Sequence, residues 1–135
     1  DGIKATPGQN VKLEKAYSDY FAKEGQKFQK ANDIAKAAEN FTKSSQVSNK
    51  QLKARGLLSL GTLYFNNGAS ILQKATPYAT SEKEKYEAEK AKALADFKKA
   101  QDYLKQAATV EPTNEAVKET QKQVADAIAP LVEKK

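Results

Sequence analysis

The sequence has no cysteine, histidine, methionine or tryptophan among its 135 residues, and only one arginine, Arg55. Without cysteine, disulfides and thiolate metal sites are excluded, although the redox compartment stays open. The lack of histidine and cysteine also removes the commonest general base, the thiol nucleophile and most zinc ligands. Chemistry could rest only on carboxylates, lysines, hydroxyls or tyrosines. We therefore expect no enzyme activity, no catalytic residue and no cofactor.

Long apolar runs are also missing. The richest stretch, residues 56–64, is much shorter than the ~20 residues that a membrane-spanning helix needs, so we expect no transmembrane segment. No phosphate loop, catalytic triad or paired-acid motif is present. The acidic residues of 82–89 could suggest a metal site, but lysines alternate with them, which favours a solvated helix face and no metal.

The net charge is +6, and no acidic residue lies between Glu39 and Glu82. This span contains Lys43, Lys50, Lys53, Arg55 and Lys74. Two interpretations stay open: an ordinary solvated surface, or binding of an acidic surface (nucleic acid or anionic lipid) through residues 43–74. The lone arginine makes nucleic acid the less favoured partner, because base and phosphate recognition relies on arginine.

Helix signals dominate the chain, and alternating strand patterns are nearly absent. The predicted helices span about residues 7–32, 34–47, 50–75, 81–109 and 113–129. Thr6 and Pro7 mark the beginning of the first helix. Ser81 and Glu84 form a capping box for the fourth helix, and Pro130 ends the fifth helix. The first helix carries an inward apolar stripe: Val11, Leu13, Tyr17, Tyr20, Phe21 and Phe28.

A pattern of large and small residues occurs twice. Phe21-x-x-x-Gly25-x-x-Phe28 recurs as Leu57-x-x-x-Gly61-x-x-Tyr64. Ala37-x-x-x-Phe41-x-x-Ser44 follows the first copy, and Ala100-x-x-x-Leu104-x-x-Ala107 follows the second. Two helices that cross closely need a large side chain beside a gap, and glycine lets the partner backbone approach. We therefore expect Gly25 and Gly61 to occupy equivalent close crossings.

This repeat resembles the tetratricopeptide repeat. The resemblance implies one all-α domain over residues 1–135, with five antiparallel helices of the right-handed α-solenoid type. Its parts would be a first hairpin at about 7–48, an elongated second hairpin at about 50–109 and a capping helix at about 113–129. The second repeat is too long for the family, so residues 66–75 and 82–93 are predicted to project as an arm. The elongated hairpin resembles a branch of exported proteins of this family from Gram-negative gut anaerobes.

The resemblance also implies a non-catalytic module or scaffold that binds a peptide or protein. Its concave surface would be formed by the first helix of each hairpin. The matching positions are Asp19, Ala22, Gln26, Gln29, Arg55, Leu58, Thr62 and Phe65. Two interpretations are open: a peptide groove, or burial of Leu58 and Phe65 under the first or fifth helix. The branch that clamps chaperone carboxylates needs lysine and asparagine where this chain has Ala22 and Gln26, so that activity is not expected.

Three further expectations concern surfaces and location. The six tyrosines could stack bases or sugars, but helical spacing favours core edges, with Tyr78 at the arm tip as an exposed anchor for a partner. Self-assembly into a homo-oligomer is an alternative, because short repeat arrays leave their end hairpins uncovered. The chain opens at Asp1 without methionine, so either a signal was removed on export to the periplasm or cell envelope, or the protein is cytoplasmic.

Overall fold

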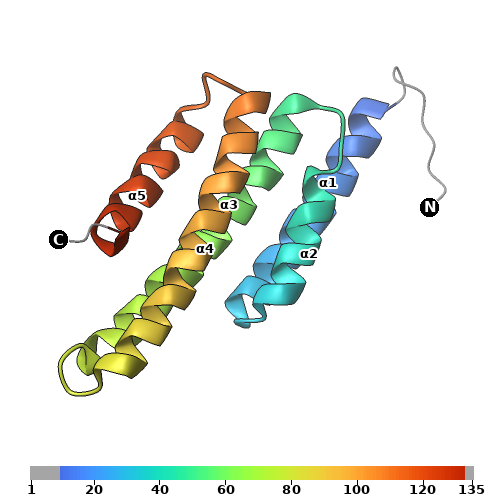
Figure 1. Ribbon diagram of the computed structural model, residues 1–135. Coiled ribbons are helices and arrows are strands. Elements are labelled where there is room, and N and C mark those ends of the chain that lie inside the picture. The colour runs from blue at the N-terminus through green and yellow to red at the C-terminus, as the bar shows by residue number, and fades with distance from the viewer. Residues whose placement is uncertain (1–9, 133–135) are drawn as a thin grey trace.

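The computed structural model describes residues 10–132. Within that range the chain forms five α-helices and one short 3-10 helix, and no strand occurs there. The elements are α1 (Asn10–Lys30), α2 (Ile34–Ser45), α3 (Lys50–Ala75), η1 (Thr76–Tyr78), α4 (Lys83–Val110) and α5 (Glu115–Val132). Figure 1 shows two helical hairpins side by side, with α2 and α4 on the near side, α1 and α3 behind them, and α5 beside α4. The all-α prediction is confirmed.

Short polar side chains cap the N-termini of three of these helices. Asp33 accepts a hydrogen bond from the Lys36 N–H at 3.1 Å, and Asn49 accepts one from the Leu52 N–H at 3.0 Å. Asn114 accepts one from the Val117 N–H at 3.1 Å. Each bond satisfies a donor that the first turn of a helix leaves without a partner. Local chemistry therefore fixes where α2, α3 and α5 start.

Two predicted helix boundaries are wrong. Ser81 does not cap α4, because the chain turns at the tip with Glu82 N–H bonded to the Tyr78 carbonyl, and Glu82 takes the N-cap position without a side-chain bond. Pro130 does not end α5, which continues to Val132. In the last turn, proline costs the helix one N–H bond, and Leu131 packs against the core there. The predicted start at Thr6-Pro7-Gly8-Gln9 lies outside the described residues.

The large-to-small pattern of the repeat forms the core. A Cβ atom built on Gly25 would lie 2.5 Å from the Phe41 ring, and one built on Gly61 would lie 2.7 Å from Leu104. Phe41 and Leu104 are fully buried, as are Ala37 and Ala100. The two glycines therefore occupy equivalent close crossings, α1 with α2 and α3 with α4, as the duplicated pattern predicts.

The predicted inward stripe of α1 is only partly correct. Phe21 and Phe28 are half-buried, but Leu13, Tyr17 and Tyr20 are 44%, 40% and 57% exposed. The reason is that α1 packs only against α2 and α3, so its opposite side has no neighbour within residues 10–132. Val11, the remaining member of the stripe, lies outside the residues whose side chains are described.

The second hairpin is longer than the first. Its helices α3 and α4 extend past the end of the α1–α2 hairpin and past α5, and the loop that joins them forms a free tip (Figure 1). The tip projects as the repeat spacing predicts, but the predicted arm is not wholly free, because Ile71 and Leu72 pack in the same cluster as Ile128 and Leu131 of α5. None of the described helices is both long enough and apolar enough to cross a membrane.

Candidate functional site

A groove of about 450 Å³ lies between α1 and α3, the first helices of the two hairpins. It is lined by Ala16, Asp19, Tyr20, Ala22, Lys23, Gln26 and Arg55. The α1 residues recur at three- and four-residue steps and so share one helix face. Asp19, Ala22, Gln26 and Arg55, all predicted for the concave surface, therefore meet in one place.

The groove is built around an ion-paired carboxylate. Asp19 lies 2.7 Å from the Lys15 ammonium and 2.8 Å from an Arg55 guanidinium nitrogen. The hydrogen bond from Lys15 and then that from Arg55 lower the pKa of Asp19, so this carboxylate is charged at neutral pH. About two fifths of the Arg55 and Asp19 side chains are exposed, so solvent screens the pair and a partner can reach it.

Two buried serines hold Arg55 in place. Ser18 and Ser44 are fully buried, and each hydroxyl donates to the backbone carbonyl of the other residue, at 2.9 Å and 2.8 Å. Arg55 in turn donates to the Ser18 hydroxyl at 2.8 Å. Sequence reasoning missed Ser18, although a serine on the inward face of a helix needs a hydrogen-bond partner and so signals such a contact.

The other predicted concave residues lie elsewhere. Gln29 lines a second groove with Asn66 and Asn67, and Phe65 lines a third, apolar groove with Leu131 of α5. Leu58 is half-buried and packs against both core clusters, which supports the alternative that it serves the core. Thr62 is half-buried on α3.

Tyr78 does not stand free at the arm tip. It lies in η1, it is half-buried, and the Lys85 ammonium sits 3.9 Å from the centre of its ring. A lysine in this position covers the face of the ring through a cation–π contact. The aromatic surface that Tyr78 offers to a partner is therefore smaller than the sequence suggests.

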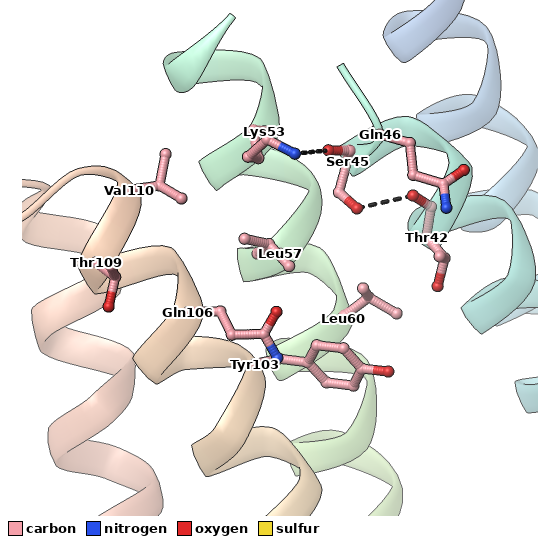
Figure 2. Close-up of a pocket in the computed structure, with 10 residues that line it drawn as sticks. All are labelled: Thr42, Ser45, Gln46, Lys53, Leu57, Leu60, Tyr103, Gln106, Thr109 and Val110. Atoms are coloured by element: carbon pink, nitrogen blue, oxygen red, sulfur yellow. Dashed lines mark hydrogen bonds between the residues drawn. The ribbon is translucent and has the colours of Figure 1, made fainter. Parts of the chain in front are cut away.

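A further groove, of about 430 Å³, opens between α2, α3 and α4. Figure 2 shows Leu57 and Leu60 on its floor, Tyr103 and Gln106 on the α4 side, and Lys53 bonded to the Ser45 carbonyl. Tyr103 stacks on Tyr64 at 5.9 Å, and burial raises the pKa of both phenols. Because Leu57 and Leu60 are 8% and 1% exposed, these two side chains offer little apolar surface to a partner.

The cations of the 43–74 span do not gather on one surface. Lys53 lines the groove beside α2, whereas Arg55 lines the groove beside α1 and is paired with Asp19. Lys43 lies 3.9 Å from Glu39, and Lys74 is exposed on the arm. Within residues 10–132, no three acidic side chains lie close enough to hold a metal ion.

Comparison with known proteins identifies a similar solved structure. No family model and no curated protein matches the chain. The solved structure of a TPR (tetratricopeptide) repeats protein from Bacteroides fragilis NCTC 9343 is similar, with 54% sequence identity and a TM-score of 0.89. The match covers 94% of this chain and 56% of that one, so this chain spans just over half the length of that protein.

Proposed function

This chain belongs to the tetratricopeptide repeat family, and we propose that it binds a peptide or protein partner in the groove between α1 and α3. Proteins built from such repeats present the curved face of the array to their partners. One observation carries the assignment: Asp19, Gln26 and Arg55 line a single open groove formed by equivalent helices of two repeats.

Charge suggests the kind of partner. Lys15, Lys23 and Arg55 lie in or beside the groove, and Asp19 is the acidic residue in its lining. A segment with aspartate or glutamate side chains complements this excess of positive charge. Arg55 is the strongest contact available, because its guanidinium is always charged and has N–H donors beyond the two that bond Asp19 and Ser18. The function we infer is that of a non-catalytic interaction module for an acidic stretch of a protein.

The test begins with crosslinking and pull-down from the source organism, followed by measured affinity for the partner that is recovered. Arg55→Gln keeps the length and polarity of the side chain but removes its charge. We expect it to weaken binding by about tenfold or more, since loss of a charge-assisted contact costs on the order of 1.5–3 kcal/mol. Lys50→Gln is the matched control, because Lys50 is exposed on the same helix and is not part of the groove lining.

Thermal unfolding of both variants separates binding from folding, because Arg55 also donates to the buried Ser18. Equal affinities of the Arg55→Gln variant and the unchanged chain would exclude the groove as the binding site. We also propose export from the cytoplasm, which is what the resemblance of the elongated hairpin to exported proteins of this family implies. Recovery of the native protein only in the cytosolic fraction would contradict export.

A further inference from the structure

The outward side of α1 carries an apolar stripe that no described element covers. Leu13, Tyr17 and Tyr20 follow one another at four- and three-residue steps, so they lie on one face of the helix. They are three of the four large hydrophobic residues that stand exposed within residues 10–132, the fourth being Val132. The Tyr17 and Tyr20 rings each pack edge-on against Phe21 at 4.9 Å, which holds the stripe in a fixed shape.

The repeat shows what covers the matching stripe on α3. Gly25 and Gly61 are equivalent, so Tyr17 matches Lys53 and Tyr20 matches Gly56. Gly56 is buried against Ser45 of α2, and Lys53 donates to the Ser45 carbonyl. The second helix of the preceding hairpin thus lies on this stripe of α3. Leu13 matches Asn49, so the α3 positions are polar or lack a side chain where the α1 stripe is apolar. The repeat therefore indicates that a helix can lie on this side of α1, but not that the two surfaces are alike.

The helix that docks there is not a copy of α2 in the same close crossing. A Cβ atom on Gly56 would already lie 2.6 Å from the Ser45 Cβ and 2.7 Å from its backbone. Tyr20 fills the equivalent position on α1 with a complete aromatic side chain. A docking helix must therefore cross α1 at a larger distance and place a small residue opposite Tyr20.

The charges around the stripe decide between possible occupants. Lys12, Lys23 and Lys27 border it on one side, and on the other side the Lys43 ammonium lies 5.2 Å from the Phe21 ring. Three carboxylates lie among these lysines: Glu24 is 3.8 Å from Lys27, Glu39 is 3.9 Å from Lys43, and Glu14 is next to Leu13. Four lysines against three carboxylates leave a small excess of positive charge, which comes from Lys12 and Lys23. A second copy placed face to face would bring lysines against lysines, which is unfavourable, whereas a helix with acidic flanks is complementary.

A second copy stacked head to tail fits no better. In such a stack the second copy would place its last helix, α5, against α1 of the first copy. The buried residues Val117 and Val124 of α5 already face the core of their own chain. The outer side of α5 carries exposed charged side chains such as Lys118, Lys122 and Asp126. Its exposed apolar residues include Ala125, Ala129 and Val132, and Lys118 and Lys122 lie among them, so it offers Leu13 and Tyr17 a smaller apolar surface than their own.

We propose that the outward stripe of α1 (Leu13, Tyr17 and Tyr20) docks an amphipathic helix of a partner protein whose apolar face is flanked by aspartate and glutamate. Leu13 and Tyr17 lie on a different side of α1 from Asp19 and Gln26 and do not line the groove between α1 and α3, whereas Tyr20 and Lys23 do line it. Tyr20 borders both surfaces, and the test therefore relies on Leu13 and Tyr17.

The probe is a helix-stabilised peptide with the sequence of residues 34–45, taken from the helix that covers the matching stripe on α3. One version carries Lys36→Glu and Lys43→Glu, and the matched control keeps both lysines. In an NMR titration of the full chain, we expect the acidic peptide to shift the backbone amides of Leu13, Tyr17 and Tyr20. It should bind on the order of tenfold more tightly than the lysine version, because only the lysine version opposes like charges.

Variants separate this surface from the groove. The double variant Leu13→Ser with Tyr17→Ser should abolish the shifts with only a small fall in the melting temperature, because neither side chain is buried in the core and the Tyr17 ring contacts Phe21 at the surface. Arg55→Gln should leave the shifts unchanged. Equal binding of the two peptides, or shifts confined to the residues around Arg55, would overturn the proposal. It would also fail if the chain alone sedimented as a dimer that the double variant returned to a monomer, because the occupant would then be a second copy.

Discussion

At the scale of single residues, one carboxylate joins α1 to the connection between the two hairpins. Glu14 accepts hydrogen bonds from the Ser48 N–H at 3.0 Å, the Ser48 hydroxyl at 2.6 Å and the Asn49 N–H at 3.0 Å. These bonds, led by that of the Ser48 side chain, lower the pKa of Glu14 below the ordinary 4.5. Charged Glu14 therefore stabilises the folded chain more than protonated Glu14 does.

The sign of the pH dependence follows from that shift. Because the folded pKa is the lower one, the stabilisation is present above pH 4.5 and is lost as pH falls through the folded pKa. We expect Glu14→Gln to lower the melting temperature at pH 7 and to flatten its fall between pH 5 and 3. Thermal unfolding at several pH values measures this, with the exposed Glu115→Gln as a control. Parallel pH profiles for the unchanged chain and Glu14→Gln would contradict the role of Glu14.

Sequence reasoning succeeded where the signal is local and failed where it is not. Gly25 and Gly61 were identified because their neighbours repeat along the chain, and the helix predicted at about residues 50–75 matches α3, Lys50–Ala75. The Glu14–Ser48 and Ser18–Ser44 contacts join residues 34 and 26 positions apart. Nothing in a helical pattern indicates which polar residues of two helices will meet. For the same reason, the sequence predicted that Asp19, Gln26 and Arg55 share a groove, but it did not predict the ion pair between Asp19 and Arg55.

At the scale of whole helices, the packing distance depends on what each glycine faces. Gly25 faces the Phe41 ring, a side chain, whereas Gly56 faces the Cα, N and Cβ atoms of Ser45 at 2.6–2.7 Å. A ring can be shortened by substitution, but a backbone cannot. The α1–α2 contact can therefore adapt to an added methyl group more easily than the α2–α3 contact, which joins the two hairpins.

We expect Gly25→Ala and Gly56→Ala each to destabilise the chain, by about 1–3 kcal/mol. The better helix propensity of alanine offsets at most about 1 kcal/mol of this. Adding Phe41→Leu to Gly25→Ala should cost less than the sum of the two single changes, because it removes ring atoms from the clash. Adding Ser45→Gly to Gly56→Ala should restore little, since the Ser45 backbone remains. Urea unfolding measures all six variants, and full rescue by Ser45→Gly would show that the helices shift apart easily.

At the scale of the whole molecule, stability should fall along the second hairpin towards the tip of the arm. No residue from Lys83 to Lys92 is buried, whereas Ala93, Phe97, Ala100, Leu104 and Ala107 of the same helix are. The exposed part of α4 is supported by the pairs Glu87–Lys90 and Glu89–Lys92, at 3.4 Å and 3.0 Å. Such pairs contribute only about 0.2–0.5 kcal/mol each, much less than burial of a large apolar side chain.

Native-state hydrogen exchange should show this gradient within a single continuous helix. We expect amides of residues 87–92 to exchange by local opening and those of residues 97–107 only by global unfolding, because the second group lies against the buried core. At about 1 M salt, screening of the ion pairs should speed exchange near the tip and leave the core segment unchanged. Uniform protection along α4 would mean that the hairpin unfolds as one unit. The arm would then be as rigid as the repeats that carry it, and its extra turns would have to be stabilised by more than the contacts described above.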